Sequence, residues 1–211
     1  MARIFTSFKT GVRAGFDPLG RTLVRLGVSP DAVTVAGTAG VVVASIWLVG
    51  TGKLIVGTIV ITLCALLDVL DGAMARARGY GTRFGAVFDS TMDRVADGAV
   101  FGALAWWLAT SGQRLLAAIV LVCLVGGQVV SYVKARAEAA GFTCDVGVAE
   151  RMERLILVGI GALLTGFGVD WGLGAAIWIL AVLSVATAGQ RIWHVRSQER
   201  LGQENRAEAA R

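Results

Sequence analysis

The sequence predicts an all-α integral membrane protein of six transmembrane helices preceded by an N-terminal amphipathic interfacial helix. Of its 211 residues, 55% are hydrophobic and 17% are charged, whereas soluble domains carry roughly 25% charged residues. The mean hydropathy is +0.69, and the apolar residues lie in long continuous blocks. Because these blocks lack the period-two alternation of membrane strands, a closed β-barrel is disfavoured.

Six apolar blocks follow residue 30, and each is long enough to cross a bilayer, which takes about 20 mostly apolar residues. The blocks cover approximately residues 32–50, 54–79, 84–110, 114–138, 149–168 and 171–193. Short glycine-containing turns separate most of them. We therefore expect a single six-helix membrane domain over residues 31–196, with no room for a second domain.

The two ends of the chain are more polar than these blocks. Residues 1–30 interleave basic and apolar side chains, which is typical of an amphipathic helix lying in the membrane interface. Ser29 and Pro30 then provide a start for the first span. Residues 197–211 are polar with mixed charge, so we expect a frayed helix or a disordered cytoplasmic tail there.

The basic residues are unevenly distributed between the two sides of the predicted membrane domain. With residue 1 placed inside, eighteen of the 20 Lys and Arg residues fall inside, and only Lys53 and Arg114 fall outside. The positive-inside rule then predicts a multi-pass protein of the cell membrane with both termini in the cytoplasm. Membrane lipids are the expected surroundings, and no nucleic-acid partner is expected.

Five carboxylates, those of Asp68, Asp71, Asp89, Asp93 and Asp97, lie inside otherwise apolar blocks. An ionisable group at membrane depth costs about 2.5–3.5 kcal/mol, so such groups are candidates for function. The first two share one helix face by their spacing of three, and the next two share another by their spacing of four. Four carboxylates from two antiparallel helices predict an all-oxygen site for two hard divalent cations. Asp97 has no assigned role.

These acids belong to a longer pattern of fixed spacing. It reads Asp68-x2-Asp71-Gly72-x2-Ala75-Arg76, then eight residues, then Gly85-x3-Asp89-x3-Asp93. The pattern matches every fixed position of the signature of the CDP-alcohol phosphotransferase family, and the chain therefore resembles that family.

The resemblance implies transfer of the phosphatidyl group of CDP-diacylglycerol to an alcohol, with release of CMP. It implies that Asp68 and Asp89 bridge two Mg²⁺ ions, or Mn²⁺, and that Asp71 completes one metal site. It implies that Asp93 binds the second ion and accepts the proton of the attacking hydroxyl. A homodimer is also implied. The implied contacts of CDP-diacylglycerol are Asp31, Ala32, Val33, Thr34, Gly72, Arg76 and Thr82.

The acceptor alcohol is predicted from a second group of residues, at the cytosolic ends of the last three blocks. They are Ser131, Lys134, Arg136, Arg151, Arg154 and Arg191. A basic pocket suits an acceptor that carries its own phosphate, and both inositol phosphate and glycerol 3-phosphate fit. Residues 81–94 resemble the actinobacterial phosphatidylinositol-phosphate synthases, which favours 1D-myo-inositol 3-phosphate as the acceptor and phosphatidylinositol phosphate as the product.

Several alternatives stay open at this point, within the family and outside it. Within the family, a phosphatidylglycerophosphate synthase using glycerol 3-phosphate is the first, although such enzymes more often have D-P-x-x-D-K where this chain has Asp89-Ser-Thr-Met-Asp93-Arg94. Unphosphorylated inositol or serine comes next. From a different class, an ion transporter would use buried acids for translocation, but transporters usually place them near the bilayer midplane. Here the acids cluster towards the cytosolic ends, beside Arg76.

Overall fold

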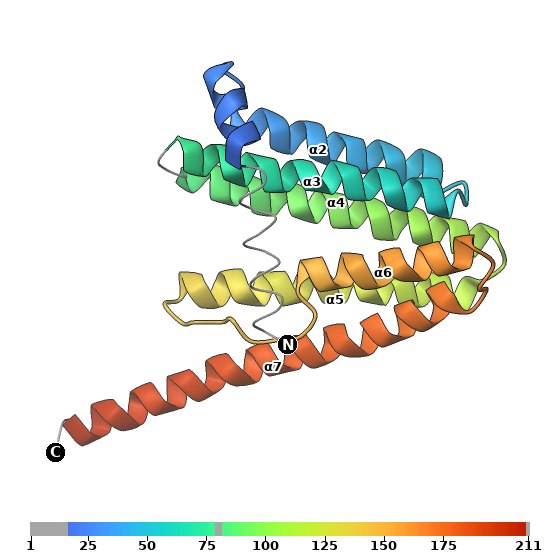
Figure 1. The fold of residues 1–211 in the computed structure, drawn as a ribbon. Helices are drawn as coiled ribbons and strands as arrows, with labels where there is room; N and C mark the ends of the chain where they lie inside the picture. Colours follow the sequence, from blue (N-terminus) through green and yellow to red (C-terminus); the bar gives the residue numbers. More distant parts are fainter. Residues whose placement is uncertain (1–16, 79–81, 210–211) are drawn as a thin grey trace. The chain divides into compact units, whose positions relative to one another are not determined.

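The computed structural model describes residues 17–78 and 82–209, apart from the side chains of Asp68, Val69 and residues 204–209. Within these ranges the regular elements are all helices (Figure 1). After a helix over residues 17–25 come α2 (Pro30–Ala44), the π-helix η1 (Ser45–Val49), α3 (Leu54–Ala77), α4 (Arg83–Thr110), α5 (Arg114–Ala139), α6 (Arg151–Gly166) and α7 (Gly172–Ala209). The prediction of an all-α chain is confirmed.

Each predicted block coincides with a helix, and most ends agree within two residues. The main difference is the end of α7, which continues through the polar residues to Ala209. Of the amphipathic helix expected over residues 1–30, residues 1–16 lie outside the described part of the chain. The glycine turn at residues 79–81 also lies outside it.

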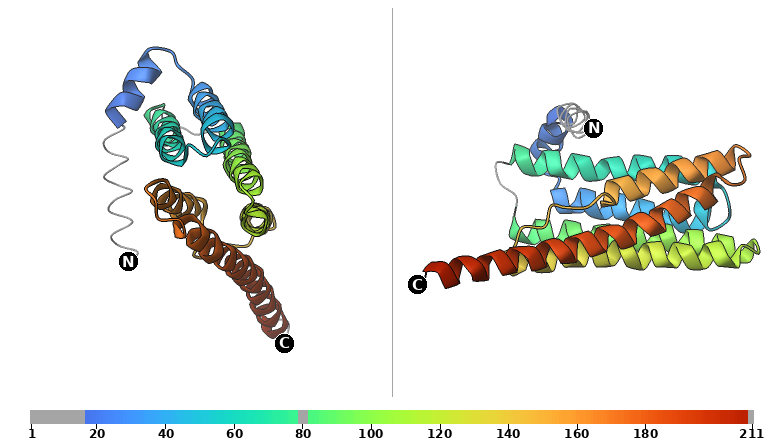
Figure 2. Two further views of the ribbon diagram at one scale, coloured as in Figure 1. Left: turned by 90° about the vertical axis from the view of Figure 1, so that its right-hand side faces the viewer. Right: turned by 90° about the horizontal axis from the view of Figure 1, so that it is seen from below.

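Residues 1–103 form one compact unit, in which α2 and α3 lie side by side (Figure 2). Their contact is close because glycines on α2 face α3, as is common between membrane helices. A Cβ on Gly37 would lie 3.2 Å from the carbonyl oxygen of Cys64, and one on Gly40 would lie 2.6 Å from the Cys64 Sγ. This contact holds the middle of α2 against the middle of α3.

The helix over residues 17–25 packs onto the same unit. Its Leu23 and Val24, together with Val28 and Leu67, contact a buried cluster of Val33, Leu70 and Met74. Gly20 is buried, and a Cβ there would lie 3.1 Å from the Cβ of Ala73. The segment before α2 is thus anchored by apolar contacts to α2 and α3.

Residues 104–211 form the second compact unit, in which α7 packs against both α5 and α6. The contact between α6 and α7 again depends on small residues, since a Cβ on Gly161 would lie 2.6 Å from the Cβ of Ala176. The segment between α5 and α6 has no regular structure. Its Val148 and Ala149 amides donate hydrogen bonds to the Thr187 Oγ1 of α7, at 3.3 and 3.1 Å.

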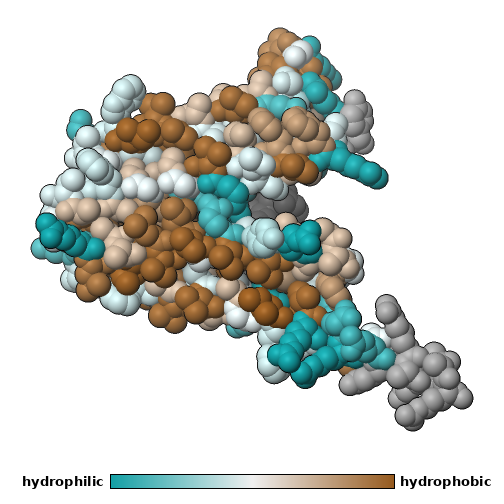
Figure 3. All heavy atoms as spheres, turned by 180° about the vertical axis from the view of Figure 1, so that it is seen from behind, coloured by the Kyte–Doolittle hydropathy of each residue, from teal (hydrophilic) through white to brown (hydrophobic). Residues whose placement is uncertain are grey.

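Four of the described helical segments are long and apolar enough to cross a membrane: Pro30–Val49, Leu54–Ala77, Arg114–Ala139 and Gly172–Gln203. Helix α4 differs because its first half carries several charged residues, and α6 is only 16 residues long. Figure 3 shows apolar side chains over much of the visible surface, with hydrophilic ones gathered towards the C-terminal part of α7. The chain is therefore a helical membrane protein.

Candidate active site

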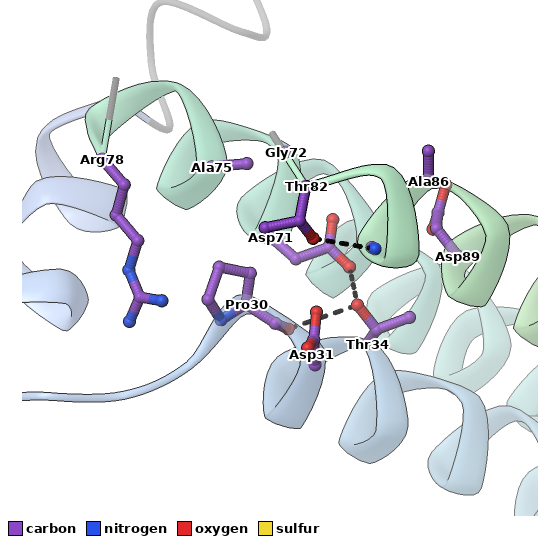
Figure 4. Close-up of a pocket in the computed structure, with 11 residues that line it drawn as sticks. Pro30, Asp31, Thr34, Asp71, Gly72, Ala75, Arg78, Thr82, Ala86 and Asp89 are labelled. Carbon is purple, nitrogen blue, oxygen red and sulfur yellow. Dashed lines mark hydrogen bonds between the residues drawn. The ribbon is translucent and has the colours of Figure 1, made fainter. Parts of the chain in front are cut away.

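A cavity of about 270 Å³ lies in the first unit, where the start of α2 meets the end of α3 and the start of α4 (Figure 4). Three helices supply its walls, and three carboxylates line it. The lining residues are Pro30, Asp31 and Thr34 from α2, Asp71, Gly72 and Ala75 from α3, Arg78 after α3, Thr82 before α4, and Gly85, Ala86 and Asp89 from α4.

Asp71 is the most enclosed of these carboxylates, with 8% of the residue exposed. The buried Thr34 hydroxyl donates a hydrogen bond to its Oδ2 and also lies 3.2 Å from the Pro30 carbonyl oxygen (Figure 4). A carboxylate withdrawn from water needs such partners, because burying an uncompensated charge is costly. Thr34 therefore fixes the position of Asp71 relative to the first turn of α2.

Asp31 and Asp89 face the same cavity from the first turn of α2 and from α4. Oxygen donors of this kind suit hard cations such as Mg²⁺ and Mn²⁺ rather than soft metals. Among the side chains that the structure describes, no three acids, histidines or cysteines converge closely enough to hold an ion. The side chain of Asp68, the fourth acid of the predicted metal site, lies outside that description. The chemistry of the donors that line the cavity nevertheless fits a divalent ion.

Asp93 lies one turn beyond Asp89 on α4, so the two share a helix face. It is partly buried and does not line the cavity. The Arg94 Nη2 lies 3.7 Å from the Asp93 Oδ2 and 4.0 Å from the Oδ2 of the buried Asp97. The arginine thus places positive charge between two neighbouring acids of this helix.

The residues predicted to contact CDP-diacylglycerol are only partly brought together. Asp31, Thr34, Gly72 and Thr82 line the cavity. Val33 instead packs in the apolar cluster with Leu70 and Met74, and Ala32 is exposed. Arg76 is also outside the lining, and its Nη2 donates a hydrogen bond of 3.1 Å to the Asp17 Oδ1.

Arg78 lines the cavity although the sequence pattern did not single it out. Its Nη2 donates a hydrogen bond of 2.8 Å to the Val28 carbonyl oxygen. This bond ties the end of α3 to the segment before α2. In the sequence, the only indication that Arg78 lines the cavity is its position two residues after Arg76, the arginine of the signature.

Thr82 has a structural role at the cavity edge as well. Its Oγ1 accepts a hydrogen bond of 2.9 Å from the Gly85 amide, which is the bond of a helix N-cap. A Cβ on Gly85 would lie 2.9 Å from that same oxygen. Glycine at position 85 therefore lets the cap form and leaves this wall of the cavity open.

Two arginines of the predicted acceptor group are deeply buried in the second unit. Arg191 is 3% exposed, and it donates bonds of 2.8 Å from Nε to the Val146 carbonyl and from Nη1 to the Val130 carbonyl. Arg154 is 1% exposed, and its Nη1 lies 3.2 Å from the Ala149 carbonyl oxygen. Gly127 faces the Arg154 guanidinium, since a Cβ there would lie 3.0 Å from Cζ.

Lys134 and Ser131 lie on α5 near these arginines. The Lys134 Nζ lies 2.6 Å from the Asp145 Oδ1 and 3.8 Å from the Glu138 Oε1. The hydrogen bond and the positive charge of Lys134 lower the pKa of the exposed Asp145 below its usual value. The Ser131 Oγ donates a 3.1 Å bond to the Gly127 carbonyl.

Arg136 and Arg151 complete the predicted acceptor group. Arg136 is exposed near the end of α5, and Arg151 opens α6. The acidic side chains of Asp145 and Glu150 lie beside this group, with the Glu150 Oε1 3.5 Å from the Arg191 Nη2. Only the folded loop between α5 and α6 brings them next to the basic residues.

Known proteins are similar to this chain in sequence and in fold. Residues 27–188 match the sequence profile of CDP-alcohol phosphatidyltransferase. The chain belongs to the CDP-alcohol phosphatidyltransferase family. Among its relatives, the phosphatidylinositol phosphate synthase of Mycobacteroides abscessus is 54% identical over 183 residues, which cover 86% of this chain and 83% of that protein.

Solved structures of this family are also similar. The crystal structure of Mycobacterium tuberculosis phosphatidylinositol phosphate synthase with CDP-DAG bound superposes with a TM-score of 0.82 at 48% identity, covering 85% of this chain and 92% of that one. The same enzyme in complex with manganese and citrate gives a TM-score of 0.82 at 48% identity, with 85% and 88% covered. The chain is therefore a CDP-alcohol phosphatidyltransferase in fold and in sequence.

Proposed function

We propose that this protein transfers the phosphatidyl group of CDP-diacylglycerol to 1D-myo-inositol 3-phosphate, giving phosphatidylinositol phosphate and CMP. The observation that carries the proposal is the 54% identity to a phosphatidylinositol phosphate synthase over 86% of the chain. A second support is the crystal structure of a relative with CDP-DAG bound. The cavity lined by Asp31, Asp71 and Asp89 supplies the polar surface that a pyrophosphate needs.

Two divalent ions, Mg²⁺ or Mn²⁺, would be held by Asp68, Asp71, Asp89 and Asp93. A manganese complex of a relative supports this assignment. When bound, such ions supply positive charge that neutralises the pyrophosphate oxygens and the departing CMP. Thr34 keeps the Asp71 carboxylate oriented for this purpose through its hydroxyl.

The chain's own residues then direct the reaction. The acceptor hydroxyl oxygen bonds to the lipid-side phosphorus, the bond from that phosphorus to the CMP oxygen breaks, and Asp93 takes the hydroxyl proton. The CDP portion lies against Asp31 and Thr34 of α2. Gly72 leaves room for the phosphates, and Arg76 and Thr82 donate hydrogen bonds to them.

The acceptor phosphate binds the basic residues that the sequence predicts for it. Arg154 and Arg191 use some of their donors to hold backbone carbonyls, and each guanidinium has five donors. When the acceptor binds, the Lys134 ammonium leaves the Asp145 carboxylate and contacts the phosphate. Ser131 donates a neutral hydrogen bond, and Arg136 and Arg151 add positive charge.

We further infer that α4 and α6 cross the membrane together with the four apolar segments, giving six spans. At 1.5 Å per residue, the 28 residues of α4 extend about 42 Å, which exceeds a hydrocarbon core of about 30 Å. The 16 residues of α6 extend about 24 Å, and local thinning of the bilayer accommodates so short a span. This topology puts both termini and the cavity on the cytoplasmic side, with the N-terminal segment in the interface. A homodimer in the cell membrane completes the proposal.

The deciding experiment compares two acceptors on the purified protein in lipid nanodiscs. With CDP-diacylglycerol and Mg²⁺, radiolabelled inositol 3-phosphate should give a labelled lipid and an equal amount of CMP, and EDTA should stop both. Product from glycerol 3-phosphate but none from inositol 3-phosphate would make glycerol 3-phosphate the acceptor. The transfer of the phosphatidyl group from CDP-diacylglycerol would still hold. If neither acceptor leads to CMP release, the proposal of a phosphorylated acceptor is wrong.

A further inference from the structure

Arg76 lies beside the cavity, with its guanidinium between Gly72 and Asp17. Its Nη1 lies 3.6 Å from the position that a Cβ would take on Gly72, a residue of the cavity wall. Its Nη2 donates the 3.1 Å hydrogen bond to the Asp17 Oδ1. The two side chains are 48% and 46% exposed, so the pair adds little to folding stability. Its effect is on the direction in which Arg76 points.

Asp17 is held in place by the packing of the helix that carries it. Leu23 and Val24 of that helix contact the buried apolar cluster at the start of α2. Gly20 lies so close to Ala73 of α3 that a Cβ on the glycine would be 3.1 Å from the alanine Cβ. These contacts do not depend on the charge of Asp17, so they hold the backbone that carries this carboxylate next to α3.

An arginine binds phosphate best when its planar donors are already oriented. Ordering a long, half-exposed side chain during binding costs free energy that an existing hydrogen bond reduces. Asp17 accepts a hydrogen bond from the Arg76 Nη2 only. The Arg76 Nη1, on the Gly72 side, is therefore left to bind the ligand. Because Asp17 is solvent-exposed, water and salt weaken its repulsion of a phosphate beyond the guanidinium.

We propose that Asp17 is a positioning residue that orients Arg76 towards the pyrophosphate of the CDP-linked lipid. The inference rests on the proposed function, in which Arg76 contacts that pyrophosphate. Asp17 precedes residue 27, where the family match begins, and it is not part of the acid signature. It therefore extends the substrate site of this chain to the helix over residues 17–25.

The test measures CDP-diacylglycerol binding directly, on the full chain in nanodiscs with Mg²⁺ and without acceptor. Asp17→Ala should weaken binding roughly three- to tenfold, and Asp17→Asn, whose amide oxygen can still accept from Arg76, should weaken it less. The KM for the acceptor and the melting temperature of the free protein should not change. Thr22→Ala is the matched control, because the Thr22 hydroxyl bonds within the same helix to the Pro18 carbonyl.

A double-mutant comparison separates positioning from a general structural effect. If Asp17 acts through Arg76, Asp17→Ala should have no further effect on binding in an Arg76→Ala background. An equal loss in both backgrounds, unchanged binding by Asp17→Ala, or tighter binding would each overturn the proposal. If the Arg76→Ala variant binds the lipid normally, the contact between Arg76 and the pyrophosphate in the proposed function is wrong. If Arg76→Ala weakens binding and Asp17→Ala does not, only the positioning role fails.

Discussion

Thr34 and Asp71 show how a short polar side chain connects two helices at the candidate site. The hydroxyl lies between the Pro30 carbonyl of its own helix and the Asp71 carboxylate of α3. Both residues are buried, so water does not readily replace this hydrogen bond. A carboxylate that is proposed to hold a metal ion thus depends on a partner from the neighbouring helix.

Replacing that hydroxyl should weaken metal binding. Thr34→Val keeps the shape of the side chain and removes the donor to Asp71, and loss of such an outer partner costs about 10–100-fold in metal affinity or activity. We expect the Mg²⁺ concentration for half-maximal CMP release to rise by about tenfold or more. Thr34→Ser, which keeps the donor, should stay near the original value. An unchanged Mg²⁺ dependence for the valine variant would contradict this role.

The proton-accepting role of Asp93 is tested by a substitution that removes its basicity. Asp93→Asn should lower CMP release by about 10²–10⁴-fold, the usual contribution of a general base. Binding of Mn²⁺, measured by electron paramagnetic resonance, should be partly retained because the remaining acids are unchanged. Asp170→Asn, at an exposed loop position, is the charge-matched control. Normal turnover by the Asp93 variant would remove this residue from the reaction.

Residue spacing predicted part of the cavity and left out another part. Asp71, Gly72 and Asp89 could be placed together because a fixed signature on two adjacent helices determines their faces. Arg78 was missed because its contact with the Val28 carbonyl joins segments 50 positions apart in the chain. The family resemblance implied that Val33 and Thr34 both contact CDP-diacylglycerol. In the structure Val33 packs in the apolar cluster and Thr34 lines the cavity, because adjacent residues of a helix point in different directions.

At the scale of helices, the contact between α2 and α3 sets the geometry of the candidate site. Gly37 lies one turn from Thr34, and a Cβ there would lie 3.2 Å from a backbone oxygen, that of Cys64. Backbone atoms of a packed helix cannot rotate away as a side chain can. Bulk at this position should therefore separate the two helices and move Thr34 away from Asp71.

Gly37→Leu should destabilise the protein by about 1–3 kcal/mol, the usual cost of overpacking, and should reduce CMP release. The melting temperature in detergent measures the first effect. Gly202→Leu is the reference substitution, because nothing lies within 4 Å of a Cβ at that position of α7, and it should not lower the melting temperature. If Gly37→Leu melts at the same temperature as the unaltered protein, the contact between α2 and α3 tolerates the added bulk.

The sequence predicted the helices well because apolar blocks and glycine-containing turns give their ends. It did not predict the π-helix Ser45–Val49, since no local residue signals the wider turn. It also did not predict that α7 continues regularly to Ala209. In that extension, Gln198 bonds to the backbone of Thr143, with its Nε2 2.7 Å from the carbonyl oxygen. Such a contact depends on folding and leaves no pattern in either segment.

For the whole molecule, the central question is the number of membrane crossings. Four described segments meet simple criteria of length and hydropathy, and six crossings are proposed. Both numbers are even, so both place the two termini on the same side. The two arrangements differ in where Ser111, after α4, and Thr143, after α5, lie. Six crossings place Ser111 outside and Thr143 inside, and four crossings place them on the opposite sides.

Cysteine labelling in intact cells distinguishes these topologies. In a background in which Cys64, Cys123 and Cys144 are replaced, Ser111→Cys should react with a membrane-impermeant maleimide added outside. Thr143→Cys should react only after the cells are opened. Gln203→Cys, expected inside in both arrangements, is the control for permeability. Labelling of position 143 but not 111 from outside would support four crossings and overturn six.

The cavity wall formed by Gly72, Ala75, Gly85 and Ala86 has a consequence for drug resistance. An inhibitor that lay against this wall would contact main-chain atoms and methyl groups there, which offer few side-chain contacts that a mutation could delete. A larger side chain at these positions would block the drug, but it would also occupy the volume that we propose for the CDP portion of the lipid substrate. Escape by mutation at this wall should therefore carry a growth defect.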